Sequence, residues 1–153
     1  MQIFLRLHGL NTRFDRLAEG GSASLMALGL RAFVGWQFFK AGIIKISDWP
    51  ATLDLFRDEY HVPLLPPELA AVMGAGGELV FPVLLLLGLF SRPAALGLFV
   101  VNLMAVISYP QLWQFECPAA IQDHMYWGII LLTLATLGPG KLSIDHFLQS
   151  KNR

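Results

Sequence analysis

Charged and proton-exchanging residues interrupt the long apolar stretches of this sequence. Arg31, Lys40 and Lys45 lie in the first stretch, Glu78 lies in the second, and His124 lies near the start of the fourth. Burying such a group in nonpolar surroundings is costly unless it is paired, so each needs a partner or a function. A carboxylate, a guanidinium and an imidazole at this depth can relay a proton or hold a polar headgroup. Glu78, Arg31 and His124 are therefore the candidate catalytic residues.

One face of the helix expected over the first stretch would place a positive charge next to Glu78. Helical spacing puts five residues on this face: Arg31, Gly35, Phe38, Gly42 and Lys45. The two glycines would let a neighbouring helix approach closely. Counted from the ends of their stretches, Arg31 lies about 12 Å and Glu78 about 18 Å from the same side, a gap that an arginine can close. The sequence predicts an Arg31–Glu78 ion pair, which either only fixes helix register or takes part in a proton relay.

Further residues are candidates for lining a ligand pocket: Lys40, Lys45, Trp36, Phe38, Asp123 and Trp127. Lys40 is also placed to extend toward the lipid headgroups. Asp123 beside His124 would form a proton port to the outer aqueous phase. Asn102, in the third stretch, is expected to make a hydrogen bond between helices. No metal site is expected, because the four histidines are scattered without ligand spacing.

Four apolar stretches must position these residues, and they cover residues 23–46, 69–90, 93–109 and 119–138. A helix needs roughly 20 residues to cross a bilayer, so three are comfortable and the third is short. Composition agrees, because 55% of the residues are hydrophobic and 14% are charged, whereas soluble domains carry about 25% charged residues. We expect an all-α fold, an integral membrane four-helix bundle. Eleven basic and eleven acidic residues cancel, which gives no indication of a nucleic-acid partner.

Short amphipathic segments flank the expected bundle. Residues 1–20 would form a cytoplasmic interfacial helix, Pro50 to Glu59 a helix in the first outer loop, and the residues after Gly140 a last short helix. The bundle would occupy residues 21–146, and residues 147–153 would be a cytoplasmic tail. Basic residues favour one side, with seven there against Lys45 and Arg57 on the other: Arg6, Arg13, Arg16, Arg92, Lys141, Lys151 and Arg153. The positive-inside rule then places both termini in the cytoplasm and the single Cys117 outside.

The order of several short motifs resembles the DoxX family of small four-span membrane proteins, over residues 24–146. The motifs are Arg31-x3-Gly35-x2-Phe38-x3-Gly42-x2-Lys45, Gly74-x3-Glu78, the run from Leu87 to Ala95, His124-x2-Trp127-Gly128, and the run from Gly138 to Asp145. The family takes its name from a small subunit of a thiosulfate:quinone oxidoreductase, and other members resemble membrane partners of thiol- or superoxide-detoxifying enzymes. The resemblance implies a redox partner and a quinone, but no catalytic residue.

Three functions stay open at this point. The first is a small subunit or membrane anchor of a thiol-, sulfur- or quinone-linked redox complex, with a polar pocket in the membrane and no catalysis by this chain alone. It has no cofactor motif of its own, so the partner would carry flavin, iron–sulfur or haem. The second is a small solute or proton-coupled permease, built as a homo-oligomer. The third is a purely structural assembly factor in which every buried charge is a packing device.

Overall fold

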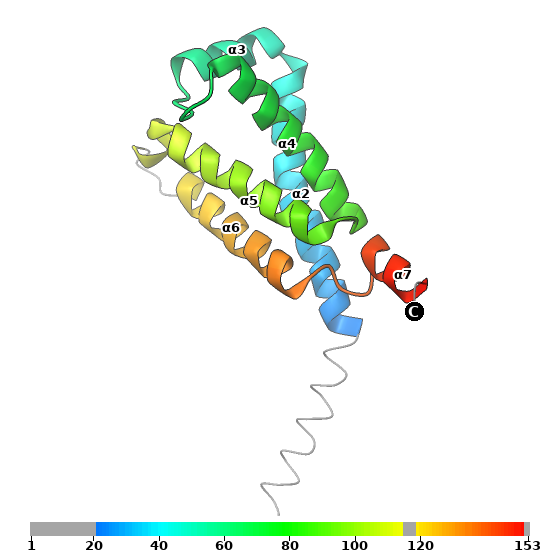
Figure 1. Ribbon diagram of the computed structural model, residues 1–153. Coiled ribbons are helices and arrows are strands. Elements are labelled where there is room, and N and C mark those ends of the chain that lie inside the picture. The colour runs from blue at the N-terminus through cyan, green and yellow to red at the C-terminus, as the bar shows by residue number, and fades with distance from the viewer. Residues whose placement is uncertain (1–20, 115–118, 152–153) are drawn as a thin grey trace, which may run out of the picture.

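The computed structural model describes residues 21–114 and 119–151 (Figure 1). This part of the chain is all helical: α2 (Ala23–Ser47), α3 (Trp49–Asp58), α4 (Pro67–Leu87), α5 (Ser91–Ser108), a 3-10 helix (Pro110–Trp113), α6 (Ala119–Leu137) and α7 (Ile144–Lys151). Each of the four apolar stretches forms one long helix, and α3 and α7 form where short helices were expected. The interfacial helix expected over residues 1–20 and the position of Cys117 lie outside the described residues.

Short-range signals explain where several helices begin and end. The Asp48 carboxylate accepts a hydrogen bond of 3.1 Å from the Ala51 amide and so caps α3. Proline at the first position of α4 needs no amide partner there. Gly88 ends α4 with a φ of 69°, in the left-handed region that favours glycine. The Ser143 hydroxyl accepts from the His146 amide and caps α7. These ends leave α4 and α5 joined by a tight turn.

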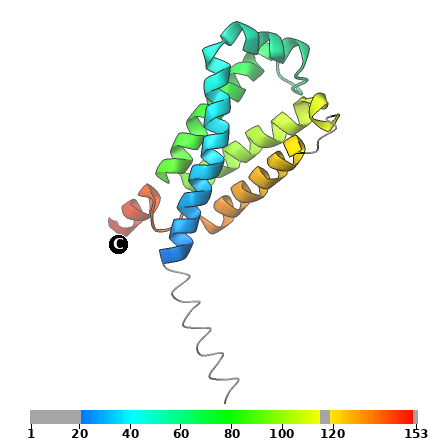
Figure 2. The same ribbon diagram turned by 180° about the vertical axis from the view of Figure 1, so that it is seen from behind.

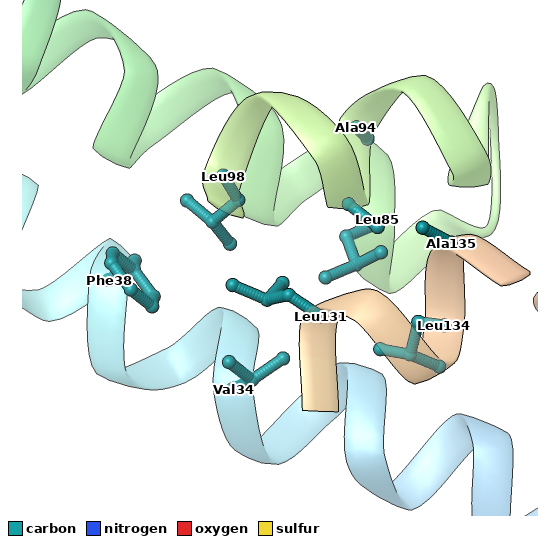
Figure 3. Packing of buried hydrophobic residues seen from close by; sticks show 9 residues of the cluster. Val34, Phe38, Leu85, Ala94, Leu98, Leu131, Leu134 and Ala135 are labelled. Carbon is teal, nitrogen blue, oxygen red and sulfur yellow. The ribbon is translucent and has the colours of Figure 1, made fainter. Parts of the chain in front are cut away.

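The long helices pack as two pairs, α2 with α4 and α5 with α6, and α4 also packs against α5 (Figures 1 and 2). Side chains from all four meet in one apolar core, where Val34, Leu85, Leu98 and Leu131 point toward one another (Figure 3). We call the end with α3 the α3 end, and the end where α2 begins and α7 lies the α7 end. The candidate residues divide between these two ends.

Two glycines set the distance between α2 and α4, as expected from their position on one face of the first apolar stretch. A Cβ atom on Gly42 would lie 2.9 Å from the Leu79 side chain and 3.1 Å from the Glu78 Cβ. A Cβ atom on Gly35 would contact Pro82, which α4 runs through without ending. The helices are therefore in near-backbone contact directly beside Glu78, and the register between them is fixed.

Large apolar side chains cover the outside of the bundle. Ile44 on α2 is 67% exposed, Leu137 on α6 is 79% exposed, and α4 and α5 expose rows of leucine and valine. A surface of this kind is typical of contact with lipid or with another protein. Within the described residues, α4 and α5 are long and apolar enough to span a bilayer, judged by length and composition.

Candidate functional site

Arg31 is fully buried at the α7 end, and it does not pair with Glu78. Its guanidinium donates to the Leu85 and Leu86 carbonyls in the last turn of α4, at 3.5 and 3.4 Å. It also donates to the Leu142 carbonyl in the loop before α7. The predicted Arg31–Glu78 pair is therefore wrong. Arg31 instead satisfies carbonyl groups at a helix C-terminus, where the helix dipole favours a cation.

The partner of Glu78 is Lys45. The Lys45 Nζ atom lies 2.9 Å from Glu78 Oε1 and 2.7 Å from Oε2, so one ammonium group binds both carboxylate oxygens. The two side chains are only 15% and 10% exposed. The pair links α2 to α4 near the α3 end, beside the contact of Gly42 with α4.

The relative level of the two helices explains the wrong pairing. The prediction put the first residue of α2 level with the last residue of the second stretch. In the structure it is Arg31 that lies level with the end of α4, so α2 extends roughly 12 Å beyond α4 (Figure 2). This offset brings Gly42 beside Glu78, and the Lys45 side chain, about one turn further along α2, reaches back to the carboxylate in place of Arg31.

Two further charged residues at the α7 end also bind helix termini. Arg92 Nη1 donates to the Ala135 and Thr136 carbonyls at 2.9 and 2.6 Å, at the C-terminus of α6. Asp145 accepts from the Phe90 and Ser91 amides and from the Ser91 hydroxyl, at 2.8 to 2.9 Å, and so caps α5. Each charge therefore meets a helix end of opposite polarity.

Asp145 also fixes the position of α7. Its own amide donates to the Gly88 carbonyl at 2.9 Å, which holds the start of α7 against the turn between α4 and α5. Burial alone would raise the pKa of its carboxyl group, but the hydrogen bonds from Ser91 and Phe90 and the charge of Arg31 outweigh burial and lower it. The sequence pattern places Asp145 only in the short helix expected after Gly140. The only signal for its role was the pair of distant motifs, from Leu87 to Ala95 and from Gly138 to Asp145.

His124 and Asn102 join α6 to α5 through two hydrogen bonds. The Asn102 Nδ2 donates to the His124 carbonyl at 2.9 Å, and Asn102 Oδ1 lies 2.7 Å from His124 Nδ1. Because the amide nitrogen is already a donor to the backbone, the amide oxygen accepts from Nδ1–H. The ring therefore carries its proton on Nδ1, and Nε2 is the nitrogen that can gain or lose one. The predicted interhelical bond of Asn102 is confirmed.

A groove of about 320 Å³ opens over this pair between α5 and α6. Its lining is almost entirely apolar, and it comes from both helices and the 3-10 helix: Phe99, Leu103, Val106, Trp113, Ile121, Met125, Gly128, Ile129 and Leu132, with Asn102 and His124. A flat or tail-like apolar ligand entering from the side of the bundle would meet the histidine and the asparagine as the polar groups of the groove.

The other predicted pocket residues do not form one site. Phe38 is buried and packs edge-to-face on Trp127 at 5.4 Å, and Trp127 in turn lies 4.9 Å from the His124 ring. Trp36 points outward and contacts Phe39. Lys40 and Asp123 are exposed. Trp36 and Phe38 therefore do not flank a common headgroup, whereas Phe38 and Trp127 support the His124 ring.

Stacked rings close the α3 end. Phe56 stacks on Tyr60 at 4.7 Å, and Tyr60 stacks on Tyr109 at 5.0 Å, which ties the residues after α3 to the end of α5. The His61 amide adds a hydrogen bond of 2.7 Å to the Ser108 carbonyl. Burial, followed by the negative charge of Glu78, raises the pKa of Tyr60 to about 12. No group of three histidine, cysteine or acidic side chains that could hold a metal ion occurs within the described ranges.

Comparison with known proteins tests the family resemblance that the motifs indicate. The DoxX family model matches residues 26–110. A protein of Haemophilus influenzae, described as an uncharacterized protein, is 30% identical over 140 residues, which cover 88% of this chain and 91% of the relative. No solved structure matches the chain significantly. With more than half of its length matched and its apolar outer surface suited to lipid, the chain belongs to the DoxX family of membrane proteins.

Proposed function

We propose that this protein is a membrane-embedded subunit of a redox complex, and that its α5–α6 groove holds a quinone-type headgroup. The observation that carries the proposal is the placement of His124 and Asn102 in a groove that is otherwise apolar and opens on the side of the bundle. A lipid-soluble carrier with a polar ring and an isoprenoid tail matches this distribution of polarity. The partner chain would carry the flavin, iron–sulfur or haem group that exchanges electrons with it.

The role of this chain would be to bind and to move a proton. With Nδ1–H donated to Asn102, a neutral His124 accepts a hydrogen bond at Nε2 from a quinol hydroxyl. Once protonated, Nε2 donates instead to a quinone carbonyl. Trp127 and Phe38 hold the ring in this orientation. Asp123, one residue away and exposed, would pass the proton on to water.

In this proposal all four long helices cross the bilayer of the bacterial inner membrane, with the α7 end in the cytoplasm. The α7 end carries Arg92, Lys141 and Lys151, whereas acidic residues concentrate at the α3 end. The groove, lined from the start of α6 and the end of α5, then lies in the outer half of the membrane.

Glu78 takes a different role from the one first expected. Both of its oxygens bind Lys45, so it acts as a counter-ion that fixes the register of α2 and α4. This pairing is the specific observation that favours the alternative, a purely structural assembly factor. The two functions differ in whether the α5–α6 groove has a ligand.

Quenching of tryptophan fluorescence by a short-chain ubiquinone tests the proposal, because Trp113 lines the groove. In nanodiscs we expect saturable quenching by the wild-type protein and a lower affinity for His124→Phe and for Leu132→Phe, whose larger ring would fill part of the groove without adding a tryptophan. His146→Phe is the matched control, because this exposed histidine on α7 lies outside the groove. Equal quenching of all four proteins would contradict the quinone site.

Purification in mild detergent tests the complex. Mass spectrometry of the associated chains should find a redox enzyme with the wild-type protein and with His124→Phe. Recovery of a folded protein without such a partner, combined with no quinone binding, would leave the assembly-factor alternative.

A further inference from the structure

A second cavity lies at the α7 end, and the proposed function does not use it. Its volume is about 830 Å³, within the size range of ligand pockets. The first two turns of α2, the first turn of α5, the last turns of α6 and the start of α7 surround it. These are the points where the apolar helices end, so the cavity reaches from the end of the bundle into its apolar part.

The polarity of the lining changes along the helix axis. Ala27, Leu30 and Leu134, which are half-buried or buried, form the inner wall, whereas Arg92, Lys141 and His146 are exposed and form the rim. The wall extends about 10 Å along α2 from Ala23 to Leu30. Leu137 and Phe90 continue the apolar surface to the outside of the bundle, where both are largely exposed. A ligand that fills the cavity is therefore charged at one end and apolar over the rest of its length.

The rim is cationic, and several of its hydrogen-bond donors have no acceptor within the described residues. Both hydrogen bonds of the Arg92 guanidinium are made by Nη1, and within the described residues no acceptor binds Nε or Nη2. The side chains of Lys141 and His146 likewise have no partner in the described part of the chain, and both residues are exposed. Asp145 also lines the cavity, but its carboxylate is occupied by the Phe90 and Ser91 donors.

We propose that this cavity is a binding site for a phospholipid with an anionic headgroup. Its phosphate binds Arg92 and Lys141 at the rim, and an acyl chain lies along the apolar wall between α2 and α6. The guanidinium suits a phosphate because its nitrogen atoms match the oxygen spacing. The apolar wall selects a lipid over free phosphate, since a small inorganic anion would leave that wall uncovered.

Native mass spectrometry in detergent, with an equimolar mixture of phosphatidylglycerol and phosphatidylcholine, tests the site. The wild-type protein should retain phosphatidylglycerol preferentially. Each basic residue near a membrane surface adds enough attraction for about a fivefold change in affinity. We therefore expect Lys141→Gln to lower the retention of phosphatidylglycerol about fivefold, and Arg92→Gln with Lys141→Gln about 30-fold.

Matched controls separate the site from general charge. Lys40→Gln with Lys151→Gln removes two cations that do not line the cavity and should leave the preference unchanged. Arg92→Lys keeps the charge but not the paired donors of the guanidinium, so it should retain part of the preference, which guards against a folding defect at the α6 terminus. Equal losses in the control pair, no preference for the anionic lipid, or displacement of the lipid by millimolar inorganic phosphate would each overturn the proposal.

Discussion

The two ends of the bundle hold their charged side chains in different ways. At the α7 end, Arg31, Arg92 and Asp145 bind backbone groups at the termini of α4, α6 and α5. Toward the α3 end, Lys45 binds Glu78, side chain to side chain. The backbone groups at helix termini are present whatever the side chains are, so no second substitution can compensate for the loss of a charge that binds them. A pair of side chains can be replaced together, so we expect the loss of Lys45 or Glu78 to be rescued by a second substitution and the loss of Arg31 not to be.

The largest effect should come from splitting the Lys45–Glu78 pair. Glu78→Leu or Lys45→Leu leaves one buried charge without a counter-ion, and each should lower the free energy of unfolding by about 3–5 kcal/mol. The double variant should recover most of this loss, because apolar replacements of buried pairs are often neutral. Reversible denaturation in mixed detergent micelles measures the four proteins. If the double variant were as unstable as the sum of the single ones, the pair would not be energetically coupled.

Removing Arg31 should cost about 3 kcal/mol or more and should have no rescuing partner, because three carbonyl groups lose a donor. Arg31→Met leaves carbonyl groups of α4 and of the loop before α7 without their donor, at about 1–3 kcal/mol for each buried group. Combined with Glu78→Leu, its effect should add to within about 0.5 kcal/mol, because the two residues are not in contact. A strong coupling in the same denaturation assay would restore the original pairing of Arg31 with Glu78.

Loss of the α5 cap should have a moderate effect. Asp145→Ala should cost about 1 kcal/mol, as for other helix caps. The pKa of Asp145 is lowered in the folded protein, so its contribution is complete above the ordinary pKa near 4 and is lost as the pH falls through the folded value. The protection of α7 amides against hydrogen exchange, corrected for the pH dependence of the intrinsic rate, should therefore fall in acid for the wild-type protein, and Asp145→Asn should remove that part of the pH dependence. An unchanged acid profile in this variant would argue against the cap.

The groove should contribute about as little to stability as the α5 cap. Asn102→Leu removes the two hydrogen bonds to His124, and at about 0.6 kcal/mol for each bond between membrane helices the loss is about 1 kcal/mol. The variant should stay folded by circular dichroism while its quinone affinity falls. A loss of stability as large as that for Arg31→Met would mean that Asn102 and His124 serve mainly to stabilise the fold rather than to bind a ligand.

Local sequence patterns are sufficient to predict the helices, the close approach at the glycine face and the interhelical hydrogen bond of Asn102. The four apolar stretches, the face with Gly35 and Gly42, and the short helices α3 and α7 are all visible in the sequence, because each depends on neighbours within a few turns. Asn102 was also recognised, since a polar amide in an apolar helix needs a partner in a neighbouring helix.

Contacts that depend on the offset between helices cannot be predicted from the sequence pattern. The partner of Glu78 changes from Arg31 to Lys45 when α2 is displaced by a few turns, and no residue in either helix encodes that displacement on its own. Asp145 was missed for a related reason: its donors, at the start of α5, lie 54 and 55 residues earlier in the chain. Such contacts follow from packing of the complete bundle.

The long separation between Asp145 and α5 has a consequence for biosynthesis. A ribosome adds about 5–20 residues per second, so 54 residues take roughly 3 to 10 seconds. During this interval α5 has been made, but the Phe90 and Ser91 amides have no cap, and Arg31 lacks the Leu142 carbonyl. The bundle is thus completed by a late segment, and a nascent chain stalled before this segment would present an open helix end to membrane quality control.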